Sequence, residues 1–496
     1  MKSIFIIMGV LLFLSGVCTA ENKTGDYLYN AGLEAFSDQY YEKAGDLFNQ
    51  SSIAYSVEGD SVSSQEALQK KKLASWMLLE MTLNETAARE VLIANIPNLS
   101  SDELDRFFMP GESIRILSDG EERYFVGIYK NAAYHNLTFI KELSRLKNHS
   151  AFYDEIYPLI TKNPDLEGWY GNPHTYIANS TVHLPRTILP DEGTLKVWLP
   201  LPIETDSQKN ITILNLKPSE YITSGPVTTG DLGEIYFEIP LAKMTSSYIN
   251  ITADYQFTAY ERRFTIEPDL VGPYDKTSEL YTRYTASQPN IELTPEVSAL
   301  AEEIVGEEQN PYQQAKLIYD YIITTYPYSN VPHTYLAASQ TPESTFLFES
   351  GFGDCGTQSM FFAALCRSVG IPARAAGGYQ LVPGSTGPHF WAEFYLPGYG
   401  WLPVDVTIAE TGDWAFNKTD EDRNRYKEYF FGNMDPFRYT IQNDVDIPFS
   451  PNPGKDVILH MVHQTPLVVC YESQEDNELL GMENWNITFS EVPYQD

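Results

Sequence analysis

The chain has 496 residues, of which 43% are hydrophobic and 13% aromatic, so it can fill more than one packed core. Its formal net charge is −34. A surface this acidic repels the phosphates of nucleic acids and of anionic membranes, and we therefore expect no nucleic-acid partner. The length predicts two to four domains.

A short apolar segment opens the chain. Lys2 precedes the apolar residues 4–14, and small residues follow as far as Ala20. This is the pattern of a signal peptide over 1–20, with cleavage after Ala20; lipid attachment at Cys18 and an uncleaved anchor are the alternatives. The pattern predicts an extracytoplasmic protein that is secreted or anchored at the cell surface, with a possible membrane tether at its N-terminus.

Asn-x-Ser/Thr sequons recur along the rest of the chain. Such tripeptides accept glycans when they lie on the surface of an exported protein. They predict an extracytoplasmic glycoprotein, with unmodified surface asparagines as the alternative. The sequons begin at Asn22, Asn49, Asn84, Asn98, Asn136, Asn148, Asn179, Asn210, Asn250, Asn417 and Asn486.

The segment 21–165 is predicted to be helical. Between residues 26 and 158, small and aromatic side chains recur at helical spacing, as in Tyr29-Asn30-Ala31-Gly32-Leu33. These offsets resemble a tetratricopeptide-type helical hairpin, although any helical bundle buries a similar stripe. We expect a structural cap here, or alternatively a partner-binding or spacer module.

After this region, the hydrophobic residues recur every 2 residues, as in a strand, instead of every 3.6, as in a helix. In 249–259, apolar and polar residues alternate, and similar short strands recur through 166–268 between turns rich in Pro, Gly and Asn. This pattern predicts a small β-sandwich. A linker over 269–293 follows, and helices resume near Pro295 with Asn310-Pro311 as a helix start. The stretch 328–353 is rich in Pro, Ser and Thr and is predicted to be an irregular connection.

A cysteine, a histidine and an aspartate follow in short, distinct contexts. Cys355 precedes the apolar run 360–365, which predicts that it opens a buried helix. The positive end of a helix dipole favours thiolate over thiol at such a position. His389 and Asp405 lie in aromatic-rich runs with strand character. Together these residues predict a thiol nucleophile with a base and an acid.

Four segments in this order resemble the transglutaminase-like superfamily, especially its secreted archaeal and bacterial members. They are Gly353-Asp354-Cys355, Gly370-Ile371-Pro372-Ala373-Arg374, His389-Phe390-Trp391-Ala392-Glu393 and Gly398-Tyr399-Gly400-Trp401-Leu402-Pro403-Val404-Asp405. The resemblance implies a papain-like core over 294–440. The whole chain is then expected to be a multidomain α+β protein, with further strands or a small β domain in the C-terminal extension 441–496.

The resemblance assigns Cys355 as nucleophile, His389 as base and Asp405 as the residue that orients the base. A second oxyanion donor should come from upstream of the cysteine, where Tyr328 is the candidate and Tyr326 the alternate. Trp391, Glu393 and Trp401 are expected to pack or to shape the cleft. Arg374 is expected to form a structural ion pair.

The expected activity is cysteine-dependent acyl transfer or hydrolysis at amide bonds of a protein or peptide substrate, through an acyl-thioenzyme. The alternative is a non-catalytic cell-surface binding or assembly protein that uses the same core as a scaffold. We expect no cofactor and no obligatory metal, because no acidic loop has EF-hand spacing. Cys366 and Cys470 either pair in a disulfide or remain buried thiols. The sequence does not fix the oligomeric state.

Overall fold

The computed structural model describes residues 24–136, 138–141, 150–161, 168–414, 419–454, 457–458, 463–473 and 476–493. The predicted signal peptide, Cys18 and the sequons at Asn22, Asn148 and Asn417 lie outside these residues. The chain divides into two compact units, Met1–Leu78 with Leu117–Glu122, and Leu79–Ile116 with Arg123–Asp496. Within the described ranges, none of the helices has the length and apolarity needed to span a bilayer.

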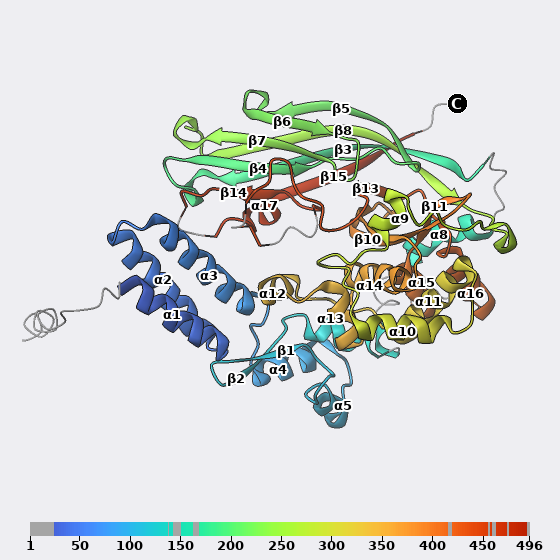
Figure 1. Cartoon of the computed structure of the whole chain (residues 1–496), viewed down its shortest axis with the longest axis horizontal. Coiled ribbons are helices and arrows are strands. Elements are labelled where there is room, and N and C mark those ends of the chain that lie inside the picture. The colour runs from blue at the N-terminus through green and yellow to red at the C-terminus, as the bar shows by residue number, and fades with distance from the viewer. Residues whose placement is uncertain are drawn as a thin grey trace, which may run out of the picture. The chain divides into compact units, whose positions relative to one another are not determined.

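The first unit is built on helices α1 (Thr24–Ser37), α2 (Tyr41–Val57) and α3 (Ser61–Leu79), drawn in blue in Figure 1. α1 and α2 pack closely because Gly32 faces an aromatic ring. A Cβ atom at Gly32 would lie 2.7 Å from the ring of Phe48. Ala35, Ala44 and Ala74 complete this small core. The predicted pattern of small against aromatic residues is therefore present, and the tetratricopeptide-like assignment stays a prediction.

The region predicted to be helical also contains a β-hairpin, so the helical prediction is wrong at this point. Strands β1 (Arg115–Ser118) and β2 (Glu121–Tyr124) are joined through Asp119 and Gly120, whose φ angles are +53° and +81°. Asp-Gly with two positive φ angles is the preferred two-residue hairpin turn. The other elements of this region are helices α4 (Glu85–Asn95), α5 (Ser101–Arg106), α6 (Ile128–Tyr134) and α8 (Ser150–Thr161).

Two antiparallel sheets follow where a β-sandwich is predicted. In the first, β12 (Asn433–Met434), β8 (Tyr248–Arg263), β3 (Tyr170–Pro185) and β15 (Trp485–Val492) lie in that order, and β5 (Gln208–Lys217) also pairs with β8. The second has the order β14 (Leu467–Val469), β4 (Thr194–Pro200), β7 (Glu234–Pro240) and β6 (Ile222–Val227). Buried residues from both sheets belong to one hydrophobic core.

The C-terminal strands join these sheets. Trp485 of β15 pairs with Val182 of β3, and Leu467 of β14 pairs with Trp198 of β4. Of the two alternatives for 441–496, the pairing supports further strands in shared sheets. Short elements complete this part of the chain: η1 (Arg186–Ile188), η2 (Ser219–Tyr221), η3 (Leu241–Lys243), η4 (Pro268–Leu270) and α17 (Leu480–Glu483).

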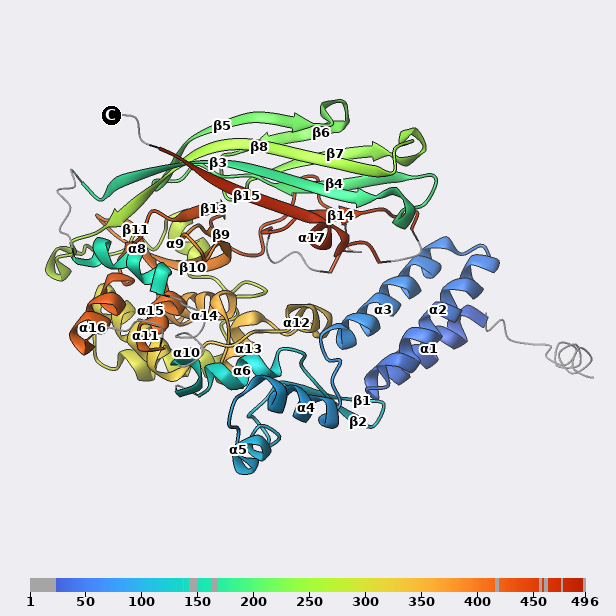
Figure 2. The same ribbon diagram turned by 180° about the vertical axis from the view of Figure 1, so that it is seen from behind.

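The remaining sheet and its helices hold the cysteine. This sheet has the order β11 (Gly400–Val404), β10 (Gly387–Leu396), β9 (Ala373–Gln380) and β13 (Arg438–Gln442). Helix α14 (Cys355–Ser368) packs against β9 and β10 and also contacts α10 (Pro295–Val305) and α11 (Pro311–Thr325). Figure 2 shows α14 among these helices, near α15 (Val406–Trp414) and α16 (Asp420–Tyr429). The mixed helix-and-sheet class predicted for the core is confirmed.

Two stretches predicted to be irregular contain helices. Residues 328–353 include α12 (His333–Ser339) and α13 (Glu343–Ser350), and the predicted linker includes α9 (Glu279–Tyr284). Pro332 and Pro342 stand directly before α12 and α13 and do not interrupt them. Proline is tolerated at a helix start, where the missing N–H has no partner to lose. The prediction failed because these prolines start helices, whereas we expected them to break regular structure.

Candidate active site

Cys355 is the first residue of α14, as predicted, and is half-buried. The helix begins there because Asp354 caps it: its carboxylate accepts the Thr357 N–H at 3.0 Å, and the Asp354 N–H donates to the Thr357 hydroxyl at 2.9 Å. This reciprocal pair satisfies backbone groups that a helix N-terminus otherwise leaves open. The cap fixes the backbone from which the Cys355 thiol projects.

His389 and Asp405 come together where β10 and β11 meet. The strands pair antiparallel, with Ala392 opposite Val404, so that Asp405 follows directly after the last paired residue. His389 Nε2 lies 2.8 Å from Asp405 Oδ2, and both side chains are buried. Asp405 Oδ1 accepts the Ile408 N–H at 3.0 Å. This pair has the geometry of a carboxylate that fixes the orientation of an imidazole.

A cavity of about 210 Å³ joins the predicted residues. Cys355, His389 and Tyr328 line it together. Its other lining residues were not predicted: Tyr134, Gln380, Ser385, Pro388, Thr407, Ile408, Thr411 and Trp414. The structure therefore brings Cys355 and His389 to one cavity and links His389 to Asp405.

Arg438 is a residue of the site that the sequence analysis missed. Its Nη1 donates to Asp405 Oδ2 at 2.7 Å, and its Nη2 donates to Asp435 at 2.5 Å. Burial would raise the pKa of Asp405, but the neighbouring His389 and Arg438 hold that pKa well below its usual range. Asp405 is therefore ionised at neutral pH and is held from two sides.

A glycine allows the strand that carries Arg438 to approach His389. Gly378 of β9 pairs with His389 on one side and with Thr440 of β13 on the other. A Cβ atom at Gly378 would lie only 1.8 Å from the carbonyl oxygen of Tyr439, which no side chain could tolerate. The Gly377-Gly378 pair was visible in the sequence, and it marks this close approach.

The electrostatics around Cys355 differ from the expectation. Burial raises the pKa of its thiol well above the usual range, the Asp354 carboxylate adds to that rise, and the N–H groups of Phe390 and Gly356 oppose it. The prediction that the helix dipole favours thiolate is therefore wrong for this structure. The reason is that desolvation and the capping carboxylate both favour the neutral thiol.

A histidine bridges two carboxylates, one of which belongs to the residue next to Cys355. His333 Nε2 lies 2.7 Å from Asp354 Oδ2, and its Nδ1 lies 2.9 Å from Glu343 Oε1. Although burial lowers the pKa of His333, the charges of Glu343 and Asp354 raise it well above its ordinary value. His333 is therefore a cation that partly offsets the charge of the residue next to Cys355.

The two tyrosine candidates lie in different places. Tyr328 lines the cavity and forms a parallel bridge with Gly353. Burial holds the pKa of Tyr328 well above its usual range, so its hydroxyl stays protonated and can donate a hydrogen bond. Tyr326 follows α11, and its ring packs at 5.2 Å from that of Phe361 in the core. Of the two tyrosines, only Tyr328 lines the cavity.

The aromatic and charged residues beside the triad candidates have structural partners. Arg374 lies 2.6 Å from the Glu393 carboxylate, and Arg262 of β8 contacts the same group at 2.5 Å. The Arg374 guanidinium also lies over the Trp401 ring, 4.0 Å from its centroid. The predicted ion pair of Arg374 is confirmed. Cys366 and Cys470 are free and buried, which supports the alternative of buried thiols.

Comparison with known proteins supplies the family. Residues 298–406 match the transglutaminase-like superfamily. This segment of the chain belongs to that superfamily. The transglutaminase-like core contains Cys355, His389 and Asp405, whereas Tyr134 and Arg438 lie outside the matched residues. The predicted resemblance is confirmed.

Two curated proteins are similar to parts of the chain. An uncharacterised protein of Haemophilus influenzae is 27% identical over 195 residues, covering 34% of this chain and 52% of that protein. A protein-glutamine gamma-glutamyltransferase of Pseudomonas aeruginosa is 29% identical over 137 residues, covering 25% of this chain and 20% of that protein. The chain thus matches about half the length of the first and a fifth of the second.

Comparison with solved structures gives lower sequence identities. A candidate cysteine protease from Cytophaga hutchinsonii gives a TM-score of 0.36 at 14% identity, covering 66% of this chain and 90% of that one. The periplasmic domain of TgpA from Pseudomonas aeruginosa, bound to ethylmercury, gives a TM-score of 0.24 at 16% identity. The match covers 51% of this chain and 94% of that one.

Proposed function

We propose that this chain is an extracytoplasmic cysteine enzyme that acts on amide bonds of proteins or peptides through an acyl-thioenzyme. Cys355 is the nucleophile, His389 the base and Asp405 the residue that orients the base. The observation that carries the proposal is the 2.8 Å contact between His389 Nε2 and Asp405, made at a cavity that Cys355 shares. The predicted signal peptide and sequons support the location outside the cytoplasm.

The reaction begins with a thiol. Because burial and Asp354 raise the pKa of Cys355, His389 must take the thiol proton as sulfur attacks the carbonyl carbon. Asp405 engages Nε2, so the proton moves to Nδ1 and the resulting imidazolium faces an ionised carboxylate. A new C–S bond forms while the carbonyl π electrons move to oxygen.

The developing oxyanion needs hydrogen-bond donors. The backbone N–H groups at the start of α14 and the protonated hydroxyl of Tyr328 are the donors we assign to it. Collapse of the intermediate breaks the C–N bond, and His389 returns its proton to the leaving amine. The acyl-thioenzyme remains, with one product released.

The acceptor decides the outcome. Water gives hydrolysis, so the enzyme acts as an amidase or peptidase, and an amine gives an isopeptide cross-link. The name of the Pseudomonas aeruginosa relative supports glutamine residues as acyl donors. The raised pKa of Cys355 favours a second candidate, a non-catalytic cell-surface binding or assembly protein built on the same core.

One assay separates these functions. A library of glutamine-containing peptides is incubated with a labelled primary amine, and the full chain is compared with its Cys355→Ala variant. Amine incorporation with ammonia release indicates transfer, ammonia release alone indicates a glutamine amidase, and chain cleavage indicates a peptidase. If the native chain gives none of these products above the Cys355→Ala background, the enzymatic proposal is refuted in favour of the binding protein.

A further inference from the structure

Helix α6 holds the segment that carries Tyr328. Asn131 Nδ2 donates to the Asn330 carbonyl at 3.0 Å, and the Asn330 N–H donates to Asn131 Oδ1 at 2.8 Å. His135, just after the helix, contacts the Ser329 hydroxyl through Nε2 at 2.6 Å. These α6 residues lie on one helical face because their spacing is close to one turn. The face therefore contacts both residues that follow Tyr328.

The same segment is bonded to the start of the cysteine helix. The Ser329 N–H donates to the Gly353 carbonyl at 2.7 Å, and the Gly353 N–H donates to the Pro327 carbonyl at 3.3 Å. Gly353 directly precedes Asp354, the cap of α14. Contacts thus run without a gap from α6 to the residues that position Cys355.

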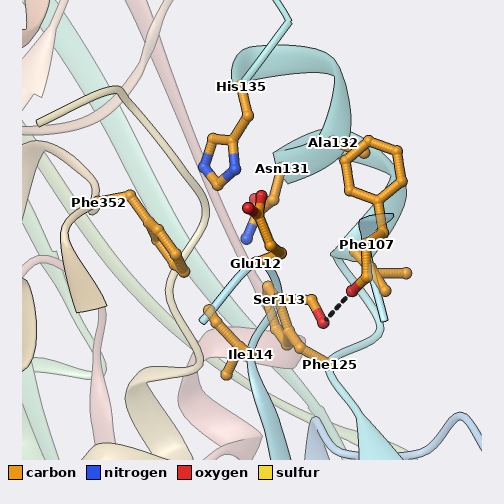
Figure 3. A pocket seen from close by; sticks show the side chains of 10 residues that line it. Phe107, Glu112, Ser113, Ile114, Phe125, Asn131, Ala132, His135 and Phe352 are labelled. Carbon is orange, nitrogen blue, oxygen red and sulfur yellow. Dashed lines mark hydrogen bonds between the residues drawn. The ribbon is translucent and has the colours of Figure 1, made fainter. Parts of the chain in front are cut away.

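α6 also borders a second pocket, shown in Figure 3. Asn131, Ala132 and His135 line it, together with Phe107 and Phe352. The rings of His135 and Phe352 lie 4.8 Å apart. Burial lowers the pKa of His135 to about 4, so its contact with Ser329 is a hydrogen bond between neutral groups at neutral pH.

Tyr134, at the end of α6, faces the cavity of the candidate active site. Its ring lies edge-on to Tyr328 at 4.8 Å and to Trp414 at 5.8 Å. All three rings line the cavity, and none of the described residues that line it is Asp, Glu, Lys or Arg. A wall of aromatic rings favours an apolar side chain and penalises a charged one.

We propose that Tyr134 is a specificity-determining residue, which forms with Tyr328 and Trp414 a subsite beside Cys355 for an uncharged apolar or aromatic side chain of a peptide substrate. The proposal rests on the proposed function for the identity of the ligand as a peptide. α6 lies outside the matched segment 298–406, so this part of the selectivity comes from the N-terminal region of the chain.

The test measures binding without turnover. The full-length Cys355→Ala variant is titrated with blocked glutamine peptides that differ at one residue beside the glutamine, which is Phe, Leu, Glu or Lys, placed on either side in turn. We expect the Phe peptide to bind about tenfold more tightly than the Glu and Lys peptides in one of the two placements. Adding Tyr134→Ala should lower that preference about fivefold, as expected for loss of aromatic contacts.

Two further variants control for folding and for position. Tyr134→Phe keeps the ring and should keep the preference, and Lys130→Ala, which alters an exposed residue of the same helix, should leave it unchanged. If Tyr134→Ala lowers the unfolding midpoint, Tyr134→Leu replaces it in the titration. Equal binding of Phe and Glu peptides, or an unchanged preference in both the Ala and Leu variants, would overturn the proposal. The titration needs no catalysis. Selective binding here, combined with no activity of the native chain in the peptide assay, would refute the proposed reaction and leave the subsite standing.

Discussion

The salt-bridge system of Arg438 makes a sharp test of how Asp405 is held. We consider Arg438→Met, which keeps an unbranched side chain of similar reach and removes the charge. The guanidinium is 7% exposed, and the carboxylates of Asp405 and Asp435 are fully buried. Asp405 keeps its bonds to His389 and to the Ile408 N–H, whereas Asp435 keeps the Phe437 N–H at 3.0 Å. Most of the lost stability therefore comes from Asp435, which keeps fewer hydrogen bonds than Asp405 when the guanidinium is removed.

Removing one partner of a buried ion pair typically costs about 3–5 kcal/mol, because the other charge stays buried and uncompensated. Solvent hardly screens these charges, because the Arg438 and Asp405 side chains are buried, so the full value applies. Asp405 has a depressed pKa, so its contribution to stability is present above its unfolded pKa of about 4 and is lost as pH falls through the folded value. The stability loss of Arg438→Met should therefore be measured near pH 7, where Asp405 of the native chain is ionised.

Urea unfolding followed by tryptophan fluorescence suits the measurement, since the buried Trp391 ring lies 5.6 Å from the Arg438 guanidinium. A chain with several domains need not unfold in one step, so the transition of the core is compared among variants. Arg438→Met should lower its midpoint strongly, and the double variant Arg438→Met/Asp435→Asn should recover about half of the loss. An unchanged midpoint in the single variant, or no recovery in the double variant, would refute this account of the Arg438 ion pairs with Asp405 and Asp435.

The remaining predictions concern other buried groups. His333→Gln should destabilise the core by about 1–2 kcal/mol, reduced from the usual value because the His333 side chain is 34% exposed. Since the folded pKa of His333 is raised, its stabilising contribution is complete below about pH 6.5 and is lost as pH rises through the folded value. Urea midpoints of the native chain should therefore fall more steeply from pH 7 to pH 10 than those of His333→Gln, and parallel profiles would contradict the bridge. Glu393→Gln leaves the buried guanidinium groups of Arg262 and Arg374 without this carboxylate, and the free energy of unfolding in chemical denaturation should fall by about 3–5 kcal/mol. An unchanged free energy of unfolding would show that solvent stabilises the two charges instead. A thiol-reactive reagent should label the buried Cys366 and Cys470 only in denaturant, and rapid labelling of either in the folded chain would contradict its burial.

Local sequence patterns predicted the parts of the site that reside in short segments. Cys355 could be placed at a helix start because an apolar run follows it, and His389 and Asp405 lie in strand-like runs at the ends of paired strands. The family resemblance then linked the three. Arg438 could not be found in this way, because its contact with Asp405 depends on the pairing of β13 with β9 across a glycine.

Other features of the site depend on contacts between distant segments. Tyr134 precedes Tyr328 by almost two hundred residues, and no repeat or motif relates α6 to the cysteine helix. The protonation preference of Cys355 was predicted from the helix dipole alone, whereas the burial of the thiol and the charge of Asp354 decide it. Burial is a property of the whole fold, and for that reason sequence reasoning gave the wrong direction for the pKa.

The most direct test of the account is the reactivity of Cys355 itself. Iodoacetamide alkylation of the native chain near pH 7.5, read by peptide mass spectrometry, should modify Cys355 in preference to the buried Cys366 and Cys470. Because the thiol depends on His389 to take its proton, alkylation of Cys355 should slow at least about tenfold in His389→Ala while the fold is retained. Equal, slow modification of all three thiols, or a His389→Ala rate equal to that of the native chain, would contradict a working cysteine–histidine pair.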